Sequence, residues 1–296
     1  MFRIVGIGEL LWDLLPTGAQ IGGAPANFAY HAGALGADAL PISRVGADPL
    51  GHDLLAQLKV LGVNADCVQI DPVRPTGTVA VEIDAEGQPQ FDIRRDVAWD
   101  HLHASSAALI AASSADAICF GTLAQRDPVS REAIRTLVAA SPSEALRVLD
   151  VNLRQQYYSR ALIEESLALA TVLKVNDLEL PRLVALFSLT GDVRAQLEQL
   201  ADRWQLRAVA LTRGDRGSVL LTAHAYSEHP GVRVTVSDTI GAGDAFTAAM
   251  TVGLLFGWSL DEVNAQANEV AAFVASCAGG TPSLPASLRD AFAQRK

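Results

Sequence analysis

Short apolar runs alternate with longer runs rich in alanine and leucine along most of this 296-residue sequence. The longer runs, such as residues 25–35 and 50–61, place their apolar residues at helical spacing, whereas the short runs have the length of buried strands. Such an alternation favours a mainly parallel sheet covered by helices on both faces. We therefore expect an α/β fold with a doubly wound sheet. The predicted strands are residues 2–8, 117–121, 147–151, 172–175 and 207–212.

One region departs from this alternation. Residues 76–83 and 88–94 alternate between apolar and polar side chains around Ala85, Glu86 and Gly87, a pattern typical of a hairpin. With no helix between them, the two strands cannot be neighbours in a parallel sheet. We expect a small sheet that projects as a lid; a hairpin at the edge of the main sheet is the alternative. The domain prediction is one unit over residues 1–296, with a lid formed by inserted segments at about 10–21 and 66–100.

The composition argues against several kinds of partner. The net charge is −10, and the three lysines are scattered, so neither a nucleic acid nor an anionic membrane finds a basic surface. Cys67, Cys119 and Cys277 are far apart and show neither a disulfide framework nor metal-ligand spacing. Glu9 and Asp13 interrupt the apolar stretch that a signal peptide needs, so the expected location is the cytoplasm.

The most informative segment is residues 237–244 (SDTIGAGD), which a helical run follows at once. Gly241, Ala242 and Gly243 leave backbone N–H groups accessible at the start of that helix, where the positive helix end favours an anion. Phosphoryl transfer needs such donors, because charge spreads over the phosphoryl oxygens in the transition state. Asp244 is then placed to accept a proton from an attacking hydroxyl. Its alternative role is that of a simple helix cap.

Two familiar nucleotide motifs are missing from the sequence. No Gly-Lys-Ser or Gly-Lys-Thr occurs, so the glycine-rich segment is not a P-loop. Residues 6–8 (GIG) continue as Glu-Leu-Leu and lack the third glycine of a dinucleotide fingerprint. A phosphate site in this chain must therefore be of another type.

Candidate sugar-binding groups lie near the N-terminus. Residues 21–27 (IGGAPAN) open a predicted helix, where glycines allow close approach of a ligand and Asn27 offers a donor and an acceptor. Asp13, just upstream, is able to accept two hydroxyl protons, and the mixture suits a neutral polyol. A Gly-Gly turn at a helix start is the alternative interpretation.

Two further segments, residues 150–154 and 176–179, directly follow predicted strands. Ligands collect at the carboxyl ends of strands in an open parallel sheet. Arg154 is therefore a candidate partner for a phosphate, with a surface salt bridge as the alternative. Glu179 is likewise either a ligand-side acid or an ordinary acid in the first turn of a helix.

Two long motifs in this order carry a family resemblance. Residues 22–27 (GGAPAN), with Gly36 and Gly46 at the matching spacing, and residues 238–244 (DTIGAGD) closely resemble the two signatures of the ribokinase-like, or PfkB, carbohydrate kinases. The resemblance extends from Phe2 to about Pro285. It implies a ribokinase-like fold with a β lid, and an enzyme that transfers phosphate from ATP to a sugar with Mg2+.

The resemblance also implies roles for individual residues. Asp244 matches the catalytic base, and Gly241, Ala242 and Gly243 match the anion hole. Asp13, Gly22, Gly23 and Asn27 match sugar-binding positions, while Asn176 and Glu179 match the Asn-x-x-Glu motif that holds magnesium through its water shell. Thr212, Gly214 and Gly217 match a loop near the nucleotide, and Asn268 falls at an adenine-side position. The residues at positions where relatives hold a monovalent cation, with K+ as the candidate, are Asp238, Ile240, Val274, Cys277, Gly279 and Ser283.

Within the family, the sequence looks most like the fructokinases. The matching stretches are residues 9–16 (ELLWDLLP), 28–31 (FAYH), 75–79 (PTGTV), 98–100 (AWD) and 121–126 (GTLAQR). Phosphorylation of fructose to fructose 6-phosphate is the predicted reaction.

Three alternatives remain. A 2-keto-3-deoxygluconate kinase would need an arginine for the substrate carboxylate, for which Arg94 and Arg95 are candidates. A nucleoside kinase is a second enzyme alternative. A non-catalytic sugar sensor is the third, although such a protein would lack the base or the magnesium motif. The expected partners are the sugar and ATP, and relatives that pair through their lids suggest a homodimer.

Overall fold

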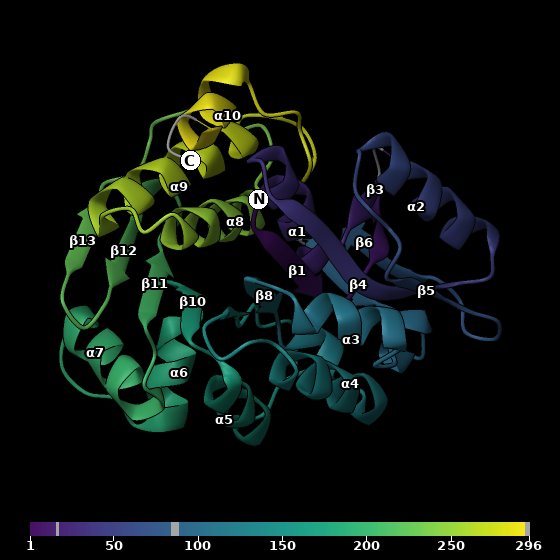
Figure 1. Ribbon diagram of the computed structural model, residues 1–296, viewed down its shortest axis with the longest axis horizontal. Coiled ribbons are helices and arrows are strands. Elements are labelled where there is room, and N and C mark those ends of the chain that lie inside the picture. Colours follow the sequence, from purple (N-terminus) through teal and green to yellow (C-terminus); the bar gives the residue numbers. More distant parts are fainter. Residues whose placement is uncertain (16–17, 84–88, 294–296) are drawn as a thin grey trace.

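The computed structural model describes residues 1–15, 18–83 and 89–293. Within them, nine strands form one sheet in the order β13-β12-β11-β10-β9-β8-β1-β4-β5 (Figure 1). All neighbours from β11 to β5 pair in parallel, and β12 and β13 add two antiparallel strands at one edge. The strands are β1 (Arg3–Ile7), β4 (Asp38–Gly46), β5 (Val68–Asp71), β8 (Ala117–Phe120), β9 (Leu146–Asp150), β10 (Val172–Asn176), β11 (Ala208–Thr212), β12 (Ser218–Leu221) and β13 (Tyr226–His229).

Helices cover both faces of this sheet, as the alternation in the sequence predicts. One face packs against α3 (Ser106–Ser113), α4 (Pro128–Ala139), α5 (Arg160–Leu169), α6 (Leu180–Phe187) and α7 (Val193–Trp204). The other face packs against α1 (Ala24–Ala34), α8 (Ala242–Leu255), α9 (Leu260–Ala275) and α10 (Ala286–Ala293). The remaining helix, α2 (Pro49–Val60), packs beside the small sheet. The expected doubly wound α/β fold is confirmed.

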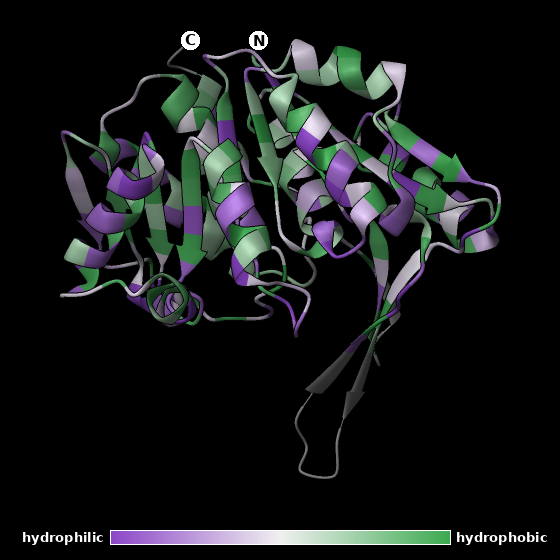
Figure 2. Cartoon of the chain, turned by 90° about the horizontal axis from the view of Figure 1, so that it is seen from below, coloured by the Kyte–Doolittle hydropathy of each residue, from purple (hydrophilic) through white to green (hydrophobic). Residues whose placement is uncertain are grey.

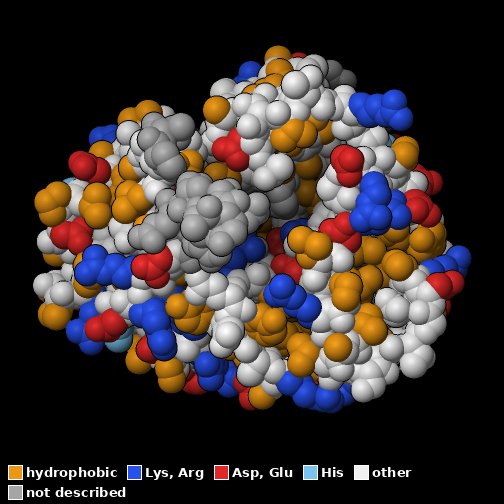
Figure 3. Space-filling view, turned by 180° about the vertical axis from the view of Figure 1, so that it is seen from behind, with side chains coloured by type: hydrophobic (Ala, Val, Ile, Leu, Met, Phe, Trp, Pro, Cys, Tyr) orange, Lys and Arg blue, Asp and Glu red, His pale blue; other side chains and the backbone are white. Residues whose placement is uncertain are grey.

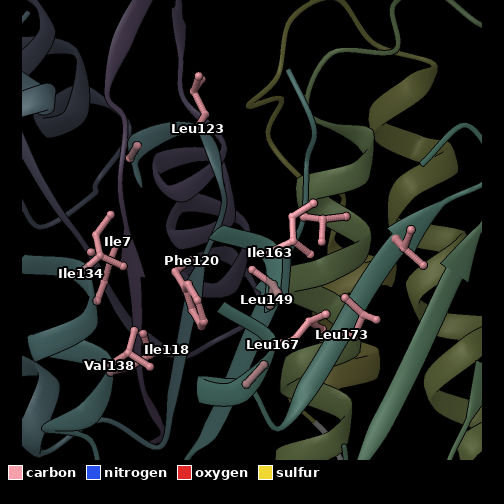
Figure 4. Close-up of a cluster of buried hydrophobic side chains, with 14 of the residues drawn as sticks. Ile7, Ile118, Phe120, Leu123, Ile134, Val138, Leu149, Ile163, Leu167 and Leu173 are labelled. Atoms are coloured by element: carbon pink, nitrogen blue, oxygen red, sulfur yellow. The ribbon is translucent and has the colours of Figure 1, made fainter. Parts of the chain in front are cut away.

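Alternation along the central strands builds two separate cores. Ile118 and Phe120 of β8 join the core under α3–α7, whereas Ala117 and Cys119 join the core under α1 and α8–α10. The same division occurs along β10, where Leu173 belongs to the first core (Figure 4). Strands buried on both faces are nearly continuously apolar, which is why they stand out in the sequence.

A second sheet has the order β3-β2-β6-β7 and stands apart from the large one. Its strands are β2 (Leu11–Leu15), β3 (Gly18–Gly22), β6 (Gly77–Ile83) and β7 (Pro89–Ile93). Figure 2 shows it projecting from the body of the molecule. Strand β6 pairs with β2 and β7, so the alternative of a hairpin at the edge of the main sheet is wrong.

The predicted lid differs from the small sheet in one of its segments. Residues 68–71 form β5 and pair with β4 in the large sheet, so the part of the predicted lid segment before Gly77 is wrongly assigned. Strands cannot be assigned to a sheet from periodicity, because alternation records burial of one face and not the identity of the partner. The expected turn residues, Ala85 to Gly87, lie outside the described residues.

Candidate active site

Polar groups gather where the parallel strands end. Asp150 is the last residue of β9, Asn176 the last of β10 and Thr212 the last of β11, and Glu9 follows β1 after one glycine. In the sheet register Lys174 lies beside Asp150, and Asn176 lies beside Thr212. Helices α1 and α8 begin close to this edge, and Figure 3 shows a hollow near the middle of one face with acidic and basic side chains in it.

The start of α8 is built for an anion. Gly241 is its N-cap with φ 75°, and a Cβ there would stand 2.4 Å from the carbonyl oxygen of Gly280. Glycine is therefore required both by the backbone conformation and by the close approach of the Gly280 backbone. No side chain caps this helix, and the N–H of Ala242 makes only a long bond of 3.4 Å to the Thr239 carbonyl, so the first turn is able to donate to a ligand.

Helix caps elsewhere in the chain make this feature informative. Six helices begin with a serine or aspartate whose side chain accepts a hydrogen bond from the first turn, whereas α1 and α8 begin with Gly23 and Gly241 and have no such cap. Uncapped helix starts therefore coincide with the polar edge of the sheet. The six capping residues are Asp48, Ser105, Asp127, Ser159, Asp192 and Ser259.

Asp244 lies in the first turn of α8 and does not cap it. Its Oδ2 accepts a hydrogen bond of 2.9 Å from Asn27 Nδ2 of α1, which joins the two sequence signatures. Burial raises the pKa of Asp244 to about 7, the neighbouring charge of Asp150 adds to this, and the bond from Asn27 and the charges of Lys174 and Arg154 oppose it. A carboxylate with a pKa near neutrality suits a general base.

A buried ion pair lies beneath the start of α8. Lys174 Nζ is 3.1 Å from one oxygen of Asp150 and 3.2 Å from the other. Thr247 Oγ1 lies 3.1 Å from Asp150 and 2.9 Å from the carbonyl of Gly243 and shares its one proton between them, so the pair is tied to the first turn of α8. A Cβ on Gly243 would lie 3.3 Å from Lys174 Nζ. This arrangement fixes the turn that carries Asp244 against strands β9 and β10.

The sugar-side residues meet at the same place. Asp13, on β2, lies so close to Gly22 on β3 that a Cβ on Gly22 would be 2.2 Å from the Asp13 carboxylate. Burial raises the pKa of Asp13 to about 6, Arg154 lowers it, and the charge of Asp238 raises it. Arg154 is exposed and also lowers the pKa of Asp244. The small sheet and the two helix starts therefore share one electrostatic environment.

Asn176 and Glu179, the predicted magnesium motif, are held in place by hydrogen bonds to the backbone. Asn176 Oδ1 accepts from the backbone N–H groups of Leu178 and Glu179, both at 2.9 Å. The buried Glu179 carboxylate accepts from the N–H groups of Leu153 and Asn176, again at 2.9 Å each. Each oxygen of the Glu179 carboxylate accepts one of these bonds and has a second lone pair left. Glu179 therefore fits a water-mediated magnesium ligand as well as a brace for the loop.

We expect Glu179→Gln to raise the magnesium concentration needed for half-maximal activity several-fold, roughly as for lost outer ligands in other metal sites. The amide has one acceptor oxygen in place of two and no charge, so it cannot keep both backbone bonds and hold a hydrated cation as well. A magnesium titration of initial rates at fixed ATP checks this. An unchanged midpoint would reduce Glu179 to a structural brace.

The predicted nucleotide side lies along the ends of β10 and β11. Gly214 and Gly217 follow Thr212 with φ 60° and 75°, and a Cβ on Gly217 would be 2.1 Å from the carbonyl of His229. Asn268 is buried, and its amide nitrogen donates to Ser218 at 2.7 Å and to the backbone carbonyl of Asn264 at 2.8 Å. This side chain therefore stabilises the packing of α9 on β12, and a role toward adenine stays a prediction.

The predicted cation loops lie side by side. Asp238 accepts from the N–H of Ile240 at 3.0 Å and from the N–H of Gly279 at 3.3 Å. The carbonyl of Val274 accepts from the N–H of Cys277, which closes the end of α9. Ser283 lies further along the same exposed loop. The two loops that the prediction names are thus brought together, while the cation itself stays a prediction.

Arg94 follows β7, its side chain is exposed, and its carbonyl accepts a bond from Arg126. The charge of Arg154 lowers the pKa of both Asp13 and Asp244. Two groups in the site escaped the sequence analysis, Glu9 and Lys174, although each is a charged residue at or beside the end of a buried strand.

Comparison with known proteins agrees with this geometry. The model of the pfkB family of carbohydrate kinases matches residues 17–287. The chain belongs to the pfkB family. It is therefore a sugar kinase with the ribokinase-like fold, as the two signatures and the sheet topology predict. Across the described residues of this kinase, no helix combines the length and apolar character needed to span a membrane.

Relatives of this pfkB-family kinase match it over nearly its whole length. A fructokinase of Klebsiella pneumoniae is 29% identical over 96% of each chain. The structure of a Pyrococcus horikoshii sugar kinase in complex with ATP is 28% identical, covers 95% of each chain and has a TM-score of 0.81. A Vibrio cholerae fructokinase, solved with fructose, ADP and calcium, is 25% identical over 99% of each chain with a TM-score of 0.79.

Proposed function

We propose that this kinase transfers the γ-phosphoryl group of ATP to a primary hydroxyl of fructose and forms fructose 6-phosphate. The observation that carries the proposal is the bond between Asn27 and Asp244 at the uncapped start of α8. This bond supports the proposal, because the amide proposed to bind the sugar and the carboxylate proposed as the base are in contact at the start of a helix that no side chain caps. The choice of fructose draws support from the similarity to the Klebsiella and Vibrio fructokinases.

In the proposed mechanism, Asp13 and Asn27 orient the sugar hydroxyls and Asp244 accepts the proton of the attacking hydroxyl. The N–H groups of residues 241–243 stabilise the negative charge on the phosphoryl oxygens as the new bond forms. Arg154, which is exposed at this edge, is positioned to pair with a phosphate. The small sheet covers the sugar and limits attack by water.

ATP with Mg2+ is the proposed phosphoryl donor. Thr212, Gly214 and Gly217 would contact the nucleotide, and Asn176 and Glu179 would hold the magnesium through water. When bound, the magnesium supplies positive charge that offsets the negative charge of the phosphate oxygens. K+ at the Asp238 loop and a homodimer through the small sheet are further parts of the proposal.

The rate is expected to depend on pH in one direction. Asp244 accepts a proton only when ionised, and its pKa is raised to about 7. As pH falls below about 7 the protonated fraction grows, so kcat/KM for the sugar should fall about tenfold per unit. A bound magnesium ion would favour the ionised form of Asp244 and so move this fall in kcat/KM to lower pH. A profile flat from pH 5 to 8 would contradict a role for Asp244 as the base.

Substrate choice is tested by ADP formation with fructose, 2-keto-3-deoxygluconate, ribose and adenosine in parallel, with Mg2+ and K+ present. Selective turnover of fructose supports the proposal. Selective turnover of 2-keto-3-deoxygluconate would overturn fructose as the substrate; Arg154→Ala would then weaken the acidic sugar more than Arg94→Ala if Arg154 binds its carboxylate. Turnover of adenosine alone would identify a nucleoside kinase.

A further inference from the structure

A buried acid with one unpartnered oxygen shares a cavity with the proposed base. Glu9 is only 4% exposed, and its Oε2 has no hydrogen-bond partner among the described residues. A buried, unpaired carboxylate oxygen is costly, since its water is removed and nothing replaces it. Such a group calls for a functional explanation.

Glu9 and Asp244 line the same small cavity. Its volume is about 10 Å3, close to the least space that holds one water molecule. Asp150 and Asn152 also line the cavity, so a water there would meet polar partners on several sides. The cavity therefore lies between Asp244 and Glu9 and has the size of one water; its wall is mostly apolar but carries the carboxyl groups of Glu9, Asp150 and Asp244.

We propose that Glu9 is the second proton acceptor of the transfer reaction, receiving the proton from Asp244 through a water in this cavity. This inference rests on the proposed function of the site. Glu9 acts through Asp244 and not on the substrate, so it is a positioning residue in a proton path. Glu9 lies outside the two family signatures, although it opens the fructokinase-like stretch of residues 9–16.

Phosphoryl transfer and the proton path together conserve atoms and charge. The O–H bond of the sugar hydroxyl breaks, its oxygen forms the new O–P bond, and ADP keeps the electron pair of the O–P bond that breaks. Asp244 takes the proton and passes it to the water, which gives one of its own protons to Glu9. After the products leave, the proton returns by the same path to solvent, and Asp244 is ionised again.

The electrostatics of the cavity favour this path. Burial raises the pKa of Glu9 to about 7, with the charge of Asp244 adding to it and Arg154 opposing it. The pKa of Asp244 is also about 7, so transfer between the two acids is nearly balanced in free energy. Asp150 raises and Lys174 lowers the pKa of Asp244.

Besides the carboxyl groups of Glu9, Asp150 and Asp244, a thiol also lines the cavity. Cys119 of β8 faces the cavity, and burial raises its pKa well above its ordinary value. It therefore stays neutral and does not compete for the proton. The acids and bases that act on the path are thus Glu9, Asp244, Asp150, Lys174 and Arg154.

The test compares Glu9→Gln, which cannot accept the proton, with Glu9→Asp, which keeps a carboxylate. We expect Glu9→Gln to lower kcat roughly 10- to 100-fold and to raise the solvent deuterium isotope effect, with KM for the sugar within about twofold. Glu9→Asp should recover part of kcat. Equal kcat and isotope effect in Glu9→Gln and the parent would overturn the proposal, as would equal losses in both variants.

A second readout does not need turnover. Infrared absorption of protonated carboxyl groups should decrease between pH 6 and pH 8 in the parent, and Glu9→Gln should lose the Glu9 part of that change while the parts from Asp244 and Asp13 remain. If the parent is inactive on every sugar, the proposed function fails, while this titration still decides whether the two acids share a site. An unchanged infrared difference in Glu9→Gln would overturn the paired acids.

Discussion

Replacing Asp244 with asparagine is expected to lower turnover by roughly 10²- to 10⁴-fold, the usual contribution of a positioned base. Asparagine has nearly the same shape and is still able to bond to Asn27, but it cannot take the proton of the sugar hydroxyl. ATP should bind with similar affinity, because the N–H groups at the start of α8 are unchanged. Single-turnover rates and nucleotide titrations measure the two effects separately.

Stability provides the control for this variant. Because the pKa of Asp244 is raised in the folded state, its favourable contribution is complete below its unfolded value near 4 and is lost as pH rises through about 7. Asp244→Asn should therefore be no less stable than the parent at pH 8. Near-normal turnover by the folded variant would remove Asp244 as the base.

Gly241→Ala is expected to reduce kcat roughly 100-fold, the order found when one donor of an anion hole is lost. A Cβ at this position would lie 2.4 Å from the Gly280 carbonyl oxygen and 2.6 Å from its Cα, and backbone atoms cannot give way as a side chain would. The start of α8 must shift, and with it the N–H groups proposed to bind the phosphate. Steady-state kinetics and a melting curve measure the effect.

Gly257→Ala is the matched control, at the other end of the same helix. Gly257 has φ 69°, close to the 75° of Gly241, but a Cβ there would meet nothing within 4 Å. It should lose about 1 to 2 kcal/mol of stability from backbone strain and keep normal turnover. Equal kinetic losses in the two variants would show that strain, and not displacement of the anion hole, explains Gly241.

The sequence predicts the large sheet well because its central strands are buried on both faces and are nearly continuously apolar. It predicts the two helix starts at the site because the glycines there have a physical role, which the φ of Gly241 confirms. Strands β5, β12 and β13 were missed or misassigned, since short strands near a sheet edge carry weak patterns. The longer strand β4 was also missed; Pro41, Ser43 and Arg44 interrupt its apolar run.

Contacts between distant segments were beyond the sequence analysis. The bond from Asn27 to Asp244 spans 217 positions, and Lys174 meets Asp150 only because β9 and β10 are neighbours. The absence of a partner for Glu9 Oε2 among the described residues is likewise a property of packing. A charged residue directly after a buried strand was the available signal for Glu9, and alone it does not separate a site from a surface.

Phosphorus NMR of the product made from ATP and fructose, with Asp244→Asn run beside the parent, tests whether this kinase forms fructose 6-phosphate with Asp244 as the base. We expect the parent to form fructose 6-phosphate in equal amount with ADP, and the variant to lose that product by orders of magnitude. ADP formed with inorganic phosphate alone, or a sugar phosphate made equally well by both proteins, would contradict it.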